Sequence, residues 1–130
     1  MSVKVTGQKE LLEALEERYG QQRLQRVSDR ALLKGAQVFV RELKRQFETF
    51  KDQGYSIEEI TIANPIWLSG KRIVRIHWRG PHDRYRIIHL NEWGTVDNPY
   101  PKGKGAVARA MRNAEKPYQA AITKAIKDGL

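Results

Sequence analysis

Three histidines with polar neighbours are the side chains of this sequence best suited to chemistry. His77, His82 and His89 fall within one short stretch that also contains Asp83 and Glu92. Histidines and carboxylates that converge on one cation, together with an oriented water, would suit metal-dependent cleavage of phosphodiesters. Their spacing matches no recognised ligand motif, and the pattern of the chain assigns the histidines to different elements. We therefore expect histidines that lie at or near the surface, and no bound metal.

Nucleophilic and phosphate-binding motifs are incomplete. Ser28, Ser56 and Ser69 lie in no Gly-x-Ser-x-Gly elbow. The glycines beside basic residues at 70–72 and 102–105 lack the full spacing of a phosphate-binding loop, so they indicate a hairpin turn and a basic loop. The sequence contains no cysteine, which excludes disulfides, thiolate metal sites and thiol nucleophiles. The sequence therefore predicts a protein that is not an enzyme and uses no cofactor.

The charge balance favours an anionic partner. Twenty-four basic residues against fifteen acidic ones give a net charge of +9, which suits nucleic acid, an acidic protein surface or an anionic membrane face. The excess is uneven. Residues 71–90 carry six basic residues and one acidic residue, and residues 101–130 carry seven and two.

A candidate DNA-facing surface lies in the first of these segments. Arginines beside aromatic residues can neutralise phosphates and stack on bases. Trp78, however, falls in the apolar row of its strand, so we expect it in the core. A solvated or subunit-facing basic surface is the favoured alternative, with weak and non-specific contact to double-stranded DNA at most. The surface comprises Lys71, Arg72, Arg75 and Arg79.

The first half of the chain predicts a strand followed by helices. A length of 130 residues suits one domain. Residues 3–6 alternate as a short edge strand, and residues 8–18 form an amphipathic helix. A long helix follows at residues 22–50, whose apolar residues recur every three or four positions. This helix is longer than one small core requires. We therefore expect part of it to pack on a neighbouring subunit. The apolar stripe comprises Leu32, Ala36, Phe39, Leu43, Phe47 and Phe50.

The second half predicts a hairpin and two further helices. A β-branched strand near residues 57–62 and a strand at 73–79 flank a turn at Ser69 and Gly70. Residues 83–93 favour a short helix with Asp83 as its N-cap and Gly94 at its end. The C-terminal helix carries a stripe that Pro117 should kink or divide. The predicted fold is α+β, with a long central helix packed on a small antiparallel sheet and a C-terminal helix. The C-terminal stripe comprises Val107, Met111, Ala114, Tyr118, Ile122 and Ala125.

The order of these elements resembles the bacteriophage tail-component family that includes minor tail protein Z and related neck proteins. The most diagnostic segment is His89-Leu90-Asn91-Glu92-Trp93-Gly94-Thr95, which is similar to the family's short helix ending in an acidic residue, an aromatic residue, glycine and threonine. A loop containing Pro99, Tyr100 and Pro101 then leads into the last helix. The resemblance spans nearly the whole chain. The sequence departs from the family pattern at residues 51–57, where only an aspartate and a glycine are kept.

The resemblance implies a structural role at the junction of head and tail, without catalytic residues, cofactor or metal. The implied partners are further copies of the chain in a ring and other neck or tail proteins, with double-stranded DNA passing nearby. The implied location is the virion, and the host cytoplasm during assembly. The N-terminal residues show no secretory signal, and no apolar run is long enough to span a membrane. A small basic nucleic-acid-binding protein is the alternative function, and a metal nuclease is the third.

The segment from Glu92 to Pro101 is the candidate partner or subunit interface. An aromatic residue on a short element before an exposed loop can anchor a contact between proteins. The competing interpretation is that Trp93 fills the core of its own domain and Gly94 only ends a helix. Both interpretations stay open at this stage. The interface residues are Glu92, Trp93, Gly94, Thr95, Pro99, Tyr100 and Pro101.

Overall fold

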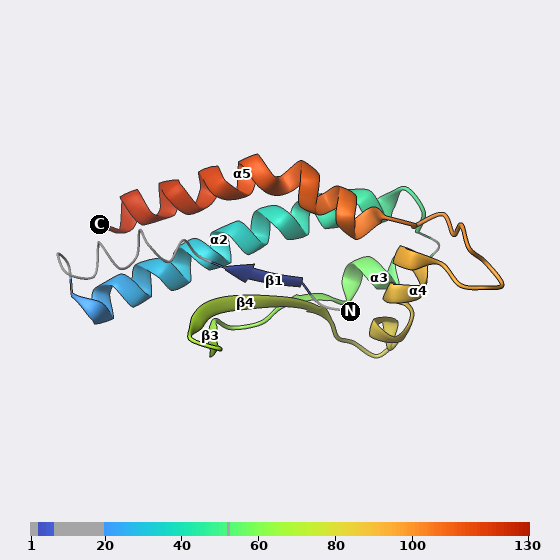
Figure 1. Ribbon diagram of the computed structural model, residues 1–130, viewed down its shortest axis with the longest axis horizontal. Helices are drawn as coiled ribbons and strands as arrows, with labels where there is room; N and C mark the ends of the chain where they lie inside the picture. The colour runs from blue at the N-terminus through green and yellow to red at the C-terminus, as the bar shows by residue number, and fades with distance from the viewer. Residues whose placement is uncertain (1–2, 7–19, 52) are drawn as a thin grey trace.

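The computed structural model describes residues 3–6, 20–51 and 53–130, and it has the predicted α+β architecture. The small sheet, helix α2 and helix α5 are stacked in that order, with α2 in the middle (Figure 1). The helix expected at residues 8–18 lies outside the described residues. In chain order the elements are β1 (Val3–Thr6), α2 (Gln21–Glu48), α3 (Tyr55–Glu58), β2 (Ile60–Ile62), β3 (Ile66–Leu68), β4 (Lys71–Trp78), η1 (Arg84–Arg86), α4 (Ile88–Trp93) and α5 (Ala106–Gly129).

Strand β4 is the centre of an antiparallel sheet. Strand β1 pairs with one side of it, as the predicted edge strand, and β2 and β3 pair in succession with the other side. The β3–β4 hairpin turns at Ser69 and Gly70, whose φ angles are 52° and 76°. Two successive positive φ angles suit the right-handed twist of a tight hairpin. The predicted turn and the strand at 73–79 are therefore confirmed. The predicted strand at 57–62 is shortened to β2, and the hairpin partner of β4 is β3, which the pattern did not predict.

The core between α2 and the sheet follows the predicted helical stripe. Leu32, Phe39, Leu43 and Phe47 are buried, as are the β4 residues that face them. The Trp78 ring stacks on that of Phe47 at 6.0 Å, and its indole nitrogen donates a hydrogen bond of 2.8 Å to the Ser56 carbonyl. The expected burial of Trp78 is confirmed, and its one polar atom is satisfied.

Helix α5 packs along α2 at very short range. A Cβ added to Gly35 would lie 2.7 Å from the Tyr118 ring, so glycine permits the approach. Near the start of α2, Val27 and Ala31 form a second buried cluster with Ile122, Ala125 and Ile126. The length of α2 is therefore matched by a helix of the same chain, so its length alone does not call for a neighbouring subunit.

The predicted helix at residues 83–93 is divided, and Asp83 does not cap it. The chain forms η1 and then α4, while Asp83 has a φ of 50° and no capping hydrogen bond from its side chain. Instead the buried carboxylate of Glu59 accepts hydrogen bonds from the backbone N–H groups of His82, at 2.8 Å, and Arg84, at 3.0 Å. The turn before η1 is therefore stabilised by Glu59, which is distant in sequence, and not by the expected cap Asp83.

Helix α5 also departs from its predicted form. It is continuous through Pro117 and arches over α2 (Figure 1). Met111 is 53% exposed, whereas Ala110 and Ala114 are buried against α2. None of the helices in the described part of the chain has the length and apolar character needed to cross a membrane.

Candidate interaction surfaces

Glu92 is an internal structural residue. It is 4% exposed, and one carboxylate oxygen accepts a 2.7 Å hydrogen bond from the N–H of Val107 while the other accepts a 3.3 Å bond from Ala108. Its backbone carbonyl accepts a further bond from the N–H of Gly105. These N–H groups open helix α5, where the helix dipole favours a negative charge. Glu92 thus joins α4 to α5, and a role in partner contact is wrong for this side chain.

The loop after α4 is held by its own backbone. Gly94 has a φ of 82°, and a Cβ at this position would lie 2.5 Å from the Pro99 carbonyl oxygen. The N–H of Thr95 donates to the Asn98 carbonyl, and the N–H of Asn98 donates to the Thr95 hydroxyl, both at 2.9 Å. Gly94 and Thr95 therefore shape the loop. Glycine is required because the backbone closes tightly on itself.

Three large apolar side chains project from the end of α4 and the loop that follows it. Trp93 is 71% exposed, Tyr100 is 81% exposed and Val96 is fully exposed. The ammonium of Lys104 lies 4.5 Å from the centre of the Tyr100 ring and donates a 2.8 Å hydrogen bond to the Pro99 carbonyl. The α4–α5 connection forms one end of the molecule (Figure 1). Trp93 does not fill the core, so that interpretation is wrong for this side chain. We call Trp93, Val96 and Tyr100 the apolar loop surface.

The four β4-region cations do not share one surface. Arg72 lies on the face of β4 that meets α2, where it forms a two-bond ion pair with Asp29 at 2.8 and 2.9 Å. Hydrogen bonding to the Asp29 carboxylate raises the pKa of Arg72. Lys71 and Arg75 fall on the opposite face of the strand, because successive side chains alternate. Arg79 follows the strand and is exposed.

The histidines are also dispersed. His77 lies on β4, His89 lies on α4, and His82 lies between these elements with its ring stacked on Tyr55 at 3.4 Å. In the residues that the structure describes, no three His, Cys, Asp or Glu side chains are grouped so that they could hold a metal ion.

A basic surface that the sequence analysis did not consider lies on α2. Five exposed cations recur at helical spacing on the side of the helix opposite its buried stripe. None of the five forms a hydrogen bond or ion pair with another described residue. Applying the 3.6-residue period to charges as well as to apolar residues would have found them. We call Arg26, Arg30, Lys34, Arg41 and Lys44 the α2 basic stripe.

No protein-family model matches the chain, and no curated protein or solved structure is significantly similar to it.

Proposed function

We propose that this chain is a non-enzymatic structural subunit of a bacteriophage virion. It acts at the junction of head and tail, as a neck or tail completion protein, and oligomerises into a ring. Two arguments support the proposal. The order of elements and the segment from His89 to Thr95 resemble tail-component proteins, and the apolar loop surface supplies an unused contact. The exposure of Trp93, Val96 and Tyr100 is the observation that carries it.

The apolar loop surface has the properties of an interface anchor. Tryptophan and tyrosine are over-represented among the residues that dominate binding energy between proteins. The loop is also fixed before binding, because Glu92 ties α4 to α5 and Gly94 closes on Pro99. A pre-ordered loop loses little conformational entropy when a partner covers it. The surface therefore favours association over an isolated monomer.

The proposed partners are further copies of the chain and other neck or tail proteins. A closed ring needs two different patches, because the loop of one copy must meet another surface on the next. The subunit would be made in the host cytoplasm and would remain in the virion. No cofactor or metal takes part.

The test is the state of association of the purified protein. We expect wild-type protein to form larger species in sedimentation velocity as its concentration rises, with rings in negative-stain electron micrographs. Replacing Trp93 and Tyr100 together by serine should abolish this association. The matched control is Trp67→Ser, because Trp67 is 59% exposed but already has Arg72 over its ring at 5.2 Å.

Association that survives the Trp93 and Tyr100 replacement would refute the loop as the contact. If the gene also lies away from genes for portal, capsid and tail-tube proteins, the virion role would be wrong as well.

A further inference from the structure

We infer that the α2 basic stripe binds the phosphate backbone of double-stranded DNA. The stripe begins at Arg26 and ends at Lys44. At a rise of 1.5 Å per residue it is about 27 Å long. That length corresponds to about eight base pairs at a rise of about 3.4 Å each. The stripe therefore has the length and charge of a surface that tracks a duplex.

Among the described residues, the carboxylates of α2 have partners other than the stripe. Asp29 is bound by Arg72 from β4. Glu42 accepts hydrogen bonds from Arg45, Gln46 and Asn113. Glu48 forms an ion pair with Lys51 at 2.8 Å. Each of the three acidic side chains of α2 is therefore bound by a residue outside the stripe.

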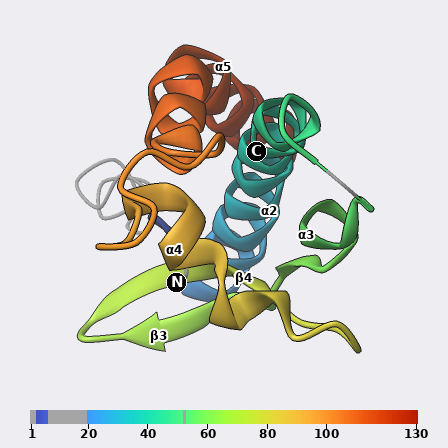
Figure 2. The ribbon, with the colours of Figure 1, turned by 90° about the vertical axis from the view of Figure 1, so that its right-hand side faces the viewer.

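The stripe lies on an open side of α2. Figure 2 shows α5 on one side of this helix, the sheet on another and the short helix α3 on the right. The buried residues of α2 face α5 and the sheet, and the stripe lies on the opposite side of the helix. All five stripe residues are exposed. A duplex can therefore approach the stripe without a change in the fold.

The composition of the stripe favours nucleic acid over a protein partner. Protein interfaces have an apolar core and are depleted in lysine. None of the exposed large hydrophobic residues in the described chain lies on α2. Long cationic side chains spaced along one line suit phosphates, which attract charge without regard to sequence. We expect binding that does not depend on base sequence.

This inference does not depend on the proposed function. The stripe and the apolar loop surface share no residue and lie on different elements. DNA binding and self-association can therefore be lost separately.

The experiment measures binding of a dye-labelled duplex by fluorescence anisotropy as salt is raised. Five phosphate contacts predict a slope of about −4.5 for log affinity against log salt, since each contact contributes about −0.9. The triple variant Arg26→Gln, Arg30→Gln and Arg41→Gln should reduce the slope to about −2 and weaken binding more than about tenfold at low salt. The same three positions changed to lysine should retain the slope, because phosphates attract the charge and not the guanidinium shape.

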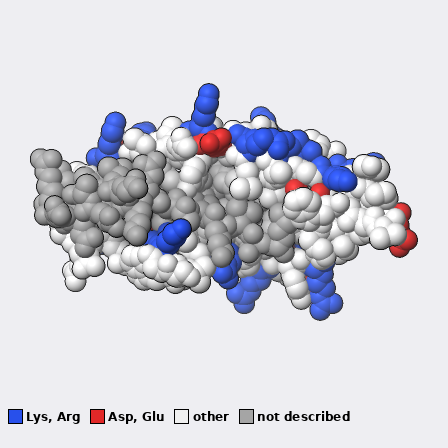
Figure 3. Space-filling model, in the orientation of Figure 1, with Lys and Arg blue, Asp and Glu red and all other residues white. Residues whose placement is uncertain are grey.

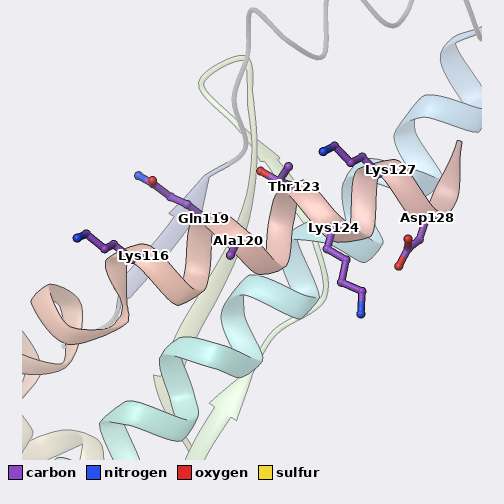
Figure 4. A pocket seen from close by; sticks show the side chains of 7 residues that line it. All are labelled: Lys116, Gln119, Ala120, Thr123, Lys124, Lys127 and Asp128. Carbon is purple, nitrogen blue, oxygen red and sulfur yellow. The ribbon is translucent and has the colours of Figure 1, made fainter.

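The matched control removes the same charge from α5. Lys116, Lys124 and Lys127 surround a shallow depression there, but Lys124 and Asp128 point away from Lys116 and Lys127 (Figure 4). An acidic side chain also lies among the basic ones over α5 (Figure 3). Replacing the three lysines by glutamine should change the slope by less than about one.

Two results would overturn the inference. An equal loss in the α5 variant would show that only net charge matters. An unchanged slope in the stripe variant, together with lost self-association in sedimentation, would assign the stripe to an acidic protein surface. Because the stripe residues are exposed and lack described partners, all variants should melt as the wild type does, and thermal melts check this.

Discussion

Glu59 and Glu92 are buried carboxylates that accept hydrogen bonds from backbone N–H groups of other segments. Glu59 holds His82 and Arg84, and Glu92 holds the first N–H groups of α5. Burying a carboxylate costs less when its oxygens are hydrogen-bonded, and each oxygen of both residues accepts one N–H. At the residue scale, these two side chains fix the ends of elements that carry the apolar loop surface.

Replacing Glu92 by alanine should destabilise the fold. The N–H of Val107 would be left buried without a partner, which costs about 1–3 kcal/mol. Glu92→Gln keeps one accepting oxygen and should cost less. Urea unfolding measures both free energies, with exposed Glu115→Ala as the control on α5. Equal stability of Glu92→Ala and wild type would show that Glu92 does not hold α5.

Glu42 should make stability depend on pH. Its pKa lies below the ordinary value of 4.5, chiefly because Asn113 donates a hydrogen bond from α5, with further contributions from Gln46 and Arg45. A lowered pKa in the folded state gives stability that is present above 4.5 and is lost as pH falls through the folded-state value.

The measurement is the difference in unfolding free energy between wild type and Glu42→Gln. We expect wild type to be the more stable near neutral pH, and the difference to shrink steadily under acidic conditions. If this difference in unfolding free energy does not change with pH, the charge of Glu42 does not contribute to stability.

At the element scale, the packing of α2 against α5 explains where the spacing of apolar residues predicted the buried face correctly and where it did not. On α2 the apolar stripe through Leu43 matches the buried face, because only one row of large side chains faces the sheet. On α5 the predicted stripe includes Met111, whereas Ala110 and Ala114 are buried in the core with α2 and Met111 is exposed. The distance between two packed helices determines which side chains fit between them, and this distance cannot be predicted from the sequence of one helix.

Leu43 and Tyr100 should separate folding from association. Leu43 has no exposed surface, so Leu43→Ala should cost about 2–5 kcal/mol and lower the melting temperature. Tyr100 is 81% exposed, so Tyr100→Ala should melt as wild type does while its self-association weakens. Circular dichroism melts and sedimentation velocity provide the two measurements. If the Leu43→Ala protein melts like wild type, the assignment of Leu43 to the buried face of α2 is wrong.

At the scale of the whole molecule, patterning predicted the α+β architecture and the turn at Ser69 and Gly70, because alternation and helical spacing are local properties. The exposure of the candidate interface segment was predicted only in part. Burial of Glu92 depends on α5, which begins 14 residues later, and no local pattern separates it from exposed Trp93. The α2 basic stripe was missed because charges were counted along the chain, while only the helix brings Arg26, Arg30 and Lys34 to one side.

The two buried clusters along α2 also imply unequal local opening. Around Leu43 the helix pair is supported by the sheet. In the described part of the chain, the cluster of Val27, Ala31, Ile122, Ala125 and Ile126 comes from two helices. Regions with fewer buried contacts open by partial unfolding before the whole domain does. In native-state hydrogen exchange, we expect amides near Leu43 to exchange only through global unfolding, and those near Ile122 to exchange sooner and with a weaker dependence on denaturant. Equal protection at both places would make the helix pair and sheet one cooperative unit.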